Sequence, residues 1–312
     1  MIKVFKRLKG HIEWHLRQLR RNIAASRPHP EILSLQLRNR FWRARIVANR
    51  GPVVSLTSYG NRLQTVFLTI ESIARGNVKP GRLILWLDEE PALSNPPRTL
   101  KRLIKRGLEI RRTENYLSHK KYLPYVLSCD TFAEPLVTAD DDVIYPRDWL
   151  QSLINAYSKN STVINCFRAR VINVQDGNLQ PFTAWQFCTS TAPSFKHFSE
   201  GVGGVIFPPQ YLSALKQAGT AFSETCPRHD DVWLNVTAVR NGFPVRQIRT
   251  SHASFNLIPD TQKDGLWVAN LGNDGDTQIR ATYSDADVAL IERDCTSTEL
   301  VEYSQKCNGC IA

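Results

Sequence analysis

The chain has 312 residues, of which 42% are hydrophobic and 22% are charged, a composition typical of globular proteins and long enough for one large domain or two small ones. No run approaches the roughly 18 apolar residues of a membrane-spanning helix, and the charges within residues 1–21 argue against a secretory signal peptide. The net charge of +11 is confined to residues 1–50, which hold 13 Lys and Arg against two acidic residues.

This basic segment is predicted to begin with an amphipathic helix that ends at Pro28 and Pro30. A basic amphipathic helix can lie in the headgroup region of an anionic membrane. Nucleic acid would attract the same charge, but the rest of the chain is neutral and has no nucleic-acid recognition module, so we expect no nucleic-acid partner. The alternative is a helix that packs on its own domain and exposes its basic face. The apolar stripe consists of Phe5, Leu8, Ile12, Leu16, Leu19 and Ile23.

From residue 51 the chain alternates between predicted strands and helices. The strands are expected at 53–59, 82–87, 108–112, 135–139, 163–167 and around 245–248, and the helices at 63–74, 97–106, 120–130, 146–158 and 231–240. This order predicts an α/β fold, a mostly parallel sheet with helices on both faces and a ligand site beyond the carboxyl ends of the strands. No GxGxxG or Walker motif follows any of these strands, and residues 170–228 lack a regular pattern.

Three consecutive carboxylates, Asp140, Asp141 and Asp142, follow the apolar strand that ends at Ala139. They would raise one another's pKa unless a cation compensates, and an oxygen-rich site suits Mg²⁺ or Mn²⁺. In extended geometry Asp140 and Asp142 project to one side and Asp141 to the other. The alternative is an acidic turn that caps the helix after Pro146.

Seven cysteines without framework spacing indicate a reducing compartment, and we therefore expect a cytoplasmic protein. Cys307 and Cys310 form a CxxC pair. A zinc site would need a second pair of ligands nearby, and the sequence offers none, so we interpret this pair as incidental.

The ordered set of motifs resembles the GT-A-fold glycosyltransferases, most closely the bacterial family-2-type enzymes of surface polysaccharide synthesis. The likeness covers about residues 50–255, and it implies a GT-A (Rossmann-like) catalytic domain at 51–255 between a leader at 1–50 and a C-terminal extension at 256–312 that packs on it. The motifs are the opening strand 53–59 followed by Arg62, then Asp140-Asp141-Asp142, and the segments 119–122, 201–204 and 229–234.

The resemblance implies a nucleotide-diphosphate sugar donor, with a UDP-sugar favoured, and Mn²⁺ or Mg²⁺ as cofactor. Asp140 would contact the ribose of the donor, and Asp142 would bind the metal that bridges its diphosphate. A divalent ion suits this reaction because it neutralises the charge that builds on the leaving diphosphate. Further donor contacts are expected from Asp141, Thr57, Tyr59, Arg62, Lys120 and Lys121, although ordinary surface charge is the alternative for the two lysines.

The second acidic pair, Asp230-Asp231, opens a predicted helix. An inverting transferase needs a carboxylate that takes the proton from the acceptor hydroxyl, and the resemblance assigns this role to Asp231, with Asp230 as the second choice. Capping of the helix is the alternative. The remaining candidates for the donor or acceptor sugar are Gly203, Gly204 and Trp233. The resemblance also implies His252 as a further metal ligand.

We therefore expect a metal-dependent glycosyltransferase that transfers a sugar, with inversion, to a glycan or lipid-linked acceptor in surface polysaccharide or glycolipid synthesis. The leader would hold it on the inner face of the cell membrane. One alternative is a metal-dependent nucleotidyltransferase, which would want a Gly-rich basic loop after the first strand, where only Gly60 and Arg62 stand near each other. The other is an inactive carbohydrate-binding or scaffold subunit.

Overall fold

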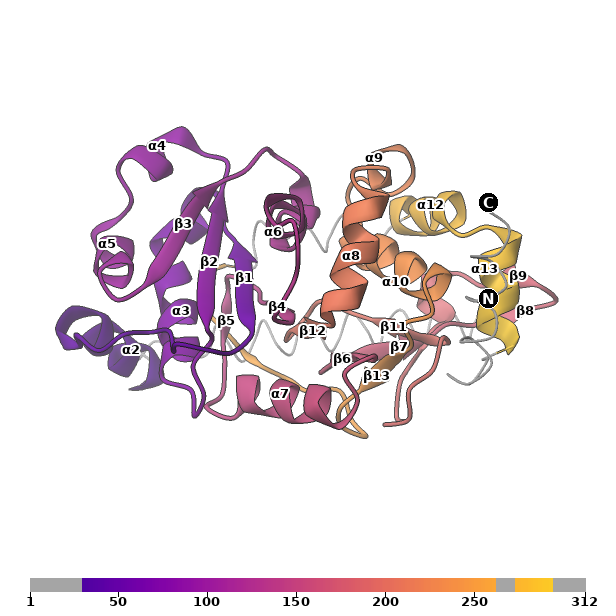
Figure 1. Ribbon diagram of the computed structural model, residues 1–312, viewed down its shortest axis with the longest axis horizontal. Helices are drawn as coiled ribbons and strands as arrows, with labels where there is room; N and C mark the ends of the chain where they lie inside the picture. The colour runs from indigo at the N-terminus through magenta and orange to yellow at the C-terminus, as the bar shows by residue number, and fades with distance from the viewer. Residues whose placement is uncertain (1–29, 262–272, 294–312) are drawn as a thin grey trace.

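The computed structural model describes residues 30–261 and 273–293 (Figure 1). The leader helix predicted before Pro28 and the Cys307–Cys310 pair lie outside these ranges. No helix in the described ranges is long and apolar enough to cross a bilayer.

A central seven-stranded sheet organises the molecule, with the strand order β13-β6-β12-β4-β1-β2-β3. All neighbouring pairs are parallel except those of β12, which runs antiparallel to β4 and β6. The expected mostly parallel sheet is thus confirmed. Its strands are β1 (Val53–Thr57), β2 (Arg82–Leu87), β3 (Leu108–Arg112), β4 (Leu136–Thr138), β6 (Ile164–Cys166), β12 (Val205–Phe207) and β13 (Val245–Gln247).

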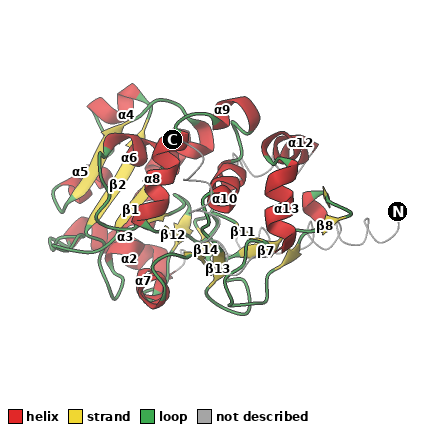
Figure 2. Ribbon diagram, turned by 45° about the vertical axis from the view of Figure 1, so that its right-hand side comes forward, coloured by secondary structure: helices red, strands yellow, loops and turns green. Residues whose placement is uncertain are grey.

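Side chains alternate between two hydrophobic cores, one on each face of this sheet. In β2, for example, Ile84 and Trp86 join the core beneath α6, α8 and α10, whereas Leu83 and Leu85 join the core beneath α2, α3, α5 and α7. Because both faces are buried, the strands read as continuous apolar runs. The two groups of helices lie on opposite sides of the sheet (Figure 2), as the sequence predicts.

Helix α2 precedes β1, the other helices that cover the sheet lie between its strands in the chain, and the last two, α12 and α13, pack on α10. The α-helices are α2 (Pro30–Phe41), α3 (Val66–Ala74), α4 (Glu90–Ser94), α5 (Arg98–Ile104), α6 (Leu123–Ser128), α7 (Trp149–Lys159), α8 (Pro209–Ala218), α9 (Phe222–Thr225), α10 (Asp230–Arg240), α12 (Asn273–Thr282) and α13 (Asp285–Arg293). Short 3₁₀ helices are η1 (Gly60–Gln64), η2 (Leu117–Lys121) and η3 (Phe182–Ala184).

Smaller sheets lie beside the central one. A three-stranded sheet has the order β10-β7-β11, and two pairs, β14-β5 and β8-β9, complete the described strands. Their bounds are β5 (Val143–Ile144), β7 (Ala169–Val171), β8 (Val174–Gln175), β9 (Asn178–Leu179), β10 (Gln186–Phe187), β11 (His197–Ser199) and β14 (Asn256–Leu257).

The sequence patterns place the longer strands well and miss the short ones. β2 and β3 have the predicted bounds, and the other predicted strands are shorter by one or two residues at their ends. β12 lies in the segment that shows no regular pattern, because three residues are too few to establish a period of two. This missed strand lies inside the sheet, between β4 and β6.

A buried ionic cluster fastens α2 to the domain. Glu71 of α3 has no exposed surface and pairs with Arg106 and with Arg38 of α2, the latter at 3.2 Å from Nε to Oε2. Asn39 of α2 donates a further hydrogen bond to Glu71, at 3.2 Å. Breaking such a pair on one side leaves an uncompensated buried charge.

We predict that Glu71→Ala lowers the free energy of unfolding by about 3–5 kcal/mol, because Arg106 would remain buried without its carboxylate. Urea denaturation measures this change. Glu90→Ala is the matched control, since Glu90 pairs with Arg112 at the surface and its loss should cost less than about 1 kcal/mol. Equal losses from the two variants would contradict the prediction.

Candidate functional site

The candidate site lies at the carboxyl ends of the parallel strands β1, β2 and β4, which meet at one edge of the sheet. The Asp140-Asp141-Asp142 segment leaves this edge directly after β4. The amide of Ala139 still bonds the carbonyl of Ser55, at 3.0 Å, so the acidic segment starts from a fixed position. η2 crosses the same edge, where the Ser55 hydroxyl donates to the carbonyl of Lys121, at 2.7 Å.

Lys121 lies near both acidic segments of the sequence. Its Nζ donates to Asp140 Oδ1 at 2.5 Å. The backbone of the 201–204 loop bonds the same two segments: the Gly201 amide donates to Asp231 Oδ1 at 3.1 Å, and the Gly203 amide donates to Asp140 Oδ2 at 3.3 Å. A methyl group at Gly201 would lie 3.1 Å from Asp231 Oδ1 and 3.7 Å from Lys121 Nζ, which places all three groups together.

Charge interactions within this group shift both titrating partners. Burial alone would lower the pKa of Lys121, but the carboxylates of Asp140, Asp230 and Asp231 outweigh it and raise that pKa above its ordinary value. Burial and the neighbouring carboxylate of Asp230 raise the pKa of Asp231 well above the ordinary aspartate value, and Lys121 opposes this rise. Lys121 therefore stays charged and favours the ionised form of Asp231.

Arg62 contacts the other two carboxylates of the acidic segment. Its guanidinium lies 2.8 Å from Asp141 Oδ1 and 3.3 Å from Asp142 Oδ2, and Ser58 donates to Asp141 at 2.7 Å. Burial raises the pKa of Asp141, with Arg62 opposing it. The predicted alternation, with Asp140 and Asp142 on one side and Asp141 on the other, is wrong, because the chain bends at 141–142 and turns both carboxylates toward Arg62.

Lys120 and Tyr59 occupy the neighbouring part of the edge. Lys120 is buried and pairs with Asp88, at the end of β2, at 2.8 Å. The Tyr59 ring has the charged groups of Lys120 and Arg62 within 6 Å of its centre. The Thr57 hydroxyl, by contrast, donates to the carbonyl of Trp86, at 3.0 Å, and thus serves the strand pair β1–β2.

The remaining predicted residues lie around the glycine loop. Gly203 has φ +84°, and a methyl group there would lie 2.2 Å from the Phe255 ring, so this position requires glycine. Gly204, with φ +104°, is similarly close to Trp149. Trp233, on α10, is buried, and its indole N–H has no hydrogen-bond partner among the described residues.

His252 lies beside the three-stranded sheet. Its ring stacks on Phe187 at 4.6 Å. Burial, and then the nearby charge of Arg168, lower the pKa of His252. The imidazole is thus held neutral beside arginines, and its role as a metal ligand stays a prediction.

Two contributors to the site could not be expected from the sequence. Tyr145, completely buried, accepts a hydrogen bond from the Asp140 amide at 2.8 Å and fixes the bend of the acidic segment. Glu200, directly before the glycine loop, pairs with Arg168 and Arg170, at 2.6 and 3.2 Å, and these arginines lower its pKa against the effect of burial. The only signal in the sequence is that each lies next to a predicted motif: Tyr145 follows the acidic segment, and Glu200 precedes the glycine loop.

The donor set fits a hard divalent cation in part. The acidic side chains at this edge of the sheet are all carboxylates, which are the ligands that Mg²⁺ and Mn²⁺ prefer. Six acidic residues lie there with three basic ones. Within residues 30–261 and 273–293, however, no three His, Cys, Asp or Glu side chains are arranged to hold a metal ion. The acids are Asp88, Asp140, Asp141, Asp142, Asp230 and Asp231, and the basic groups are Arg62, Lys120 and Lys121. An anionic ligand would have to supply further oxygens.

No protein-family model and no curated protein sequence matches the chain. Among solved structures, a mannosyltransferase from Pyrobaculum calidifontis, in complex with GDP-Man and Mn²⁺, is similar with a TM-score of 0.49 and 13% identity, over 84% of this chain and 76% of that one. TarS 1–349 from S. aureus gives 0.44 and 12% over 77% and 68%, and a 4-diphosphocytidyl-2C-methyl-D-erythritol synthase from Anaerococcus prevotii gives 0.45 and 15% over 72% and 98%. These likenesses concern the fold alone.

We predict opposite shifts of the Asp231 pKa in two variants. Lys121→Met should raise it, because the attraction of the ammonium is lost, and Asp230→Asn should lower it, because a like charge is removed. Titration of the ¹³C-labelled Asp231 carboxyl by NMR measures both shifts. An Asp231 that titrates in the ordinary aspartate range and moves in neither variant would contradict this electrostatic arrangement.

Proposed function

We propose that the protein is a glycosyltransferase that moves a sugar from a nucleotide-diphosphate donor to a glycan or lipid-linked acceptor with inversion. The observation that carries this proposal is the Lys121 ammonium, which pairs with the donor-side carboxylate Asp140 and lies near the partly buried carboxylate Asp231. Donor binding and proton removal need separate carboxylates close to one another, and Asp140 and Asp231 would meet this need at the carboxyl ends of the strands.

On the donor side, Asp142 would hold Mn²⁺ or Mg²⁺ together with oxygens of the diphosphate, and Asp140 would contact the ribose. Bound there, the ion would supply charge neutralisation to the leaving diphosphate. Arg62 and Lys120 add positive charge at the same edge, and the ring of Tyr59 near both of them would stack on a base or ribose. A UDP-sugar is the donor we favour.

On the acceptor side, Asp231 would take the proton of the attacking hydroxyl. The acceptor oxygen forms a bond to the anomeric carbon, the bond from that carbon to the diphosphate breaks, and the nucleoside diphosphate leaves with the electron pair. A raised pKa makes the Asp231 carboxylate a stronger base, while Lys121 keeps a usable fraction ionised. Asp230, one residue earlier, raises the Asp231 pKa and is the alternative base.

The loop after β1 favours glycosyl transfer over nucleotidyl transfer. A nucleotidyltransferase would use a flexible Gly-rich basic loop here to cradle a triphosphate. The segment is instead the 3₁₀ helix η1, with one glycine, and its basic residue Arg62 is turned toward Asp141 and Asp142. The presence of Asp140, Asp142 and Asp231 likewise argues against an inactive scaffold subunit.

The cellular setting completes the proposal. A lipid-linked acceptor would place this cytoplasmic enzyme on the inner face of the cell membrane, with residues 1–50 as its leader. The catalytic domain at 51–255 and the extension at 256–312 remain the proposed division of the chain. Within the described part of the extension, α13 is held to α10 by the pair Asp287–Arg240, at 2.8 Å.

Calorimetric titration of UDP, GDP and CMP tests the donor site. We expect one nucleotide, UDP by preference, to bind in the presence of Mn²⁺, and EDTA or Asp142→Ala to weaken this binding by tenfold or more, about 1.4 kcal/mol. Asp148→Ala is the matched control, because Asp148 follows the same segment but forms a surface pair with Arg249. Failure of all three nucleotides to bind a folded protein, or equal loss in the control, would overturn the proposal.

A further inference from the structure

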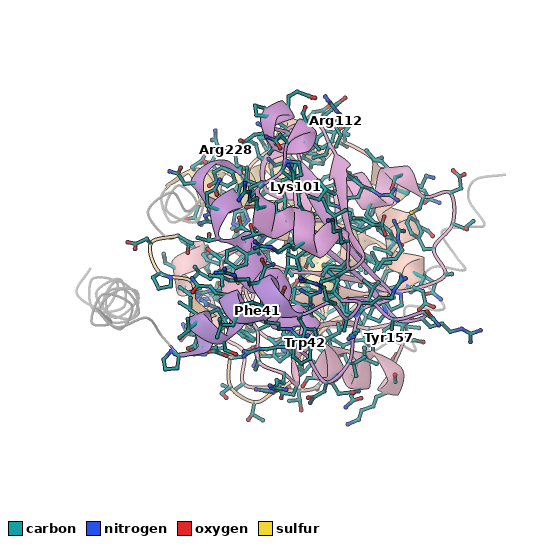
Figure 3. All side chains as sticks on the ribbon, turned by 90° about the vertical axis from the view of Figure 1, so that its left-hand side faces the viewer. Phe41, Trp42, Lys101, Arg112, Tyr157 and Arg228 are labelled. Atoms are coloured by element: carbon teal, nitrogen blue, oxygen red, sulfur yellow. The ribbon has the colours of Figure 1, made fainter. Side chains whose placement is uncertain are left out.

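Helix α2 exposes a stripe of large apolar side chains that nothing in the described structure covers. Leu33, Leu37 and Phe41 follow one another at intervals of four and therefore share one face of the helix, and Trp42 comes directly after it. Their exposed fractions are 45%, 48%, 63% and 52%. Phe41 and Trp42 stand together on the surface at this end of the molecule (Figure 3).

The opposite face of α2 is fixed to the domain, so the helix cannot turn to bury the stripe. Leu35 is fully buried in the core, and Asn39 bonds the buried Glu71. The Glu31 carboxylate at the start of the helix pairs with Arg75, at the end of α3. The stripe is therefore presented rigidly to the outside.

Basic side chains surround this stripe. Arg40, Arg43 and Arg45 are exposed in and after the helix. The guanidinium of Arg38 lies 5.0 Å from the Trp42 ring centre and that of Arg40 lies 5.4 Å from the Phe41 ring centre, which holds the two aromatic rings among positive charges. Aromatic and aliphatic side chains flanked by arginines suit the boundary between acyl chains and anionic headgroups.

We propose that the exposed face of α2, with Leu33, Leu37, Phe41 and Trp42, docks on an anionic lipid surface. Three partners could cover the stripe: a second copy of the chain, residues 1–29, or a lipid surface. Their charges distinguish them. A second copy of the chain, docked through the same face, would bring Arg40 and Arg43 against their own equivalents. Residues 1–29 carry eight Lys and Arg against one Glu, so they too would place positive charge against these arginines. An anionic bilayer is complementary to both the arginines and the apolar stripe. This inference stands apart from the enzymatic activity and names a contact additional to the predicted leader helix.

Co-sedimentation of the full chain with vesicles tests the proposal. We expect binding to vesicles of 70% phosphatidylcholine and 30% phosphatidylglycerol, little binding to pure phosphatidylcholine, and a partition coefficient lowered by roughly tenfold or more in Phe41→Ser/Trp42→Ser. Leu127→Ser is the matched control, because Leu127 is 42% exposed on α6, away from the stripe, and should leave partition unchanged. Arg40→Glu/Arg43→Glu should weaken binding to the anionic vesicles alone.

The leader could bind the same vesicles, so each variant is also measured with Leu8→Glu/Leu16→Glu, which breaks the predicted apolar stripe of that segment. The proposal requires the α2 variants to weaken partition in both backgrounds. Unchanged partition in both would overturn it. So would a change of oligomeric state without lipid, measured by sedimentation velocity, because the stripe would then be a contact between copies. Urea midpoints equal to wild type establish that the variants are folded.

Discussion

The ion pair of the Lys121 ammonium with Asp140, close enough to Asp231 to act on its charge, is the interaction on which the site depends. Asp140, Asp230 and Asp231 repel one another, and all three are withdrawn from water to different extents. Without a cation between them, such carboxylates would take up protons or move apart. Lys121 is suited to this role because its own backbone carbonyl is fixed to Ser55 of β1, so the sheet itself determines where the ammonium lies.

The glycine loop at 201–204 also holds the carboxylates of Asp140 and Asp231 in place. β12 runs antiparallel between β4 and β6, and the loop before it therefore passes over the carboxyl end of β4. The amides of Gly201 and Gly203 reach Asp231 and Asp140 only because no side chain intervenes: a methyl group at Gly203 would collide with Phe255. The loop that the sequence suggests for a sugar thus also positions the two carboxylates.

Local sequence patterns predict the strands, the helices and the sheet, but not the contacts between side chains of separate segments. The apolar runs of β1, β2 and β4 and the helical periodicity between them were enough to predict the sheet and the edge where Asp140, Arg62 and Lys121 meet. They could not reveal β12, which is too short for a period of two to show. They also could not reveal the bend at Asp141, which depends on the contacts of the acidic segment with Tyr145 and Arg62. Periodicity reports the face on which a residue lies, whereas an ion pair such as Lys121–Asp140 depends on how separate segments pack.

Product identity in a turnover assay tests the central claim most directly. The purified protein, with Mn²⁺, would be given a panel of nucleotide sugars and nucleoside triphosphates together with a lipid extract of cell envelopes as acceptor. The account predicts release of a nucleoside diphosphate from one nucleotide sugar, slowed by about 100-fold or more in Asp231→Asn, which should still bind the nucleotide. Release of pyrophosphate from a nucleoside triphosphate, or full activity of the Asp231 variant, would contradict it.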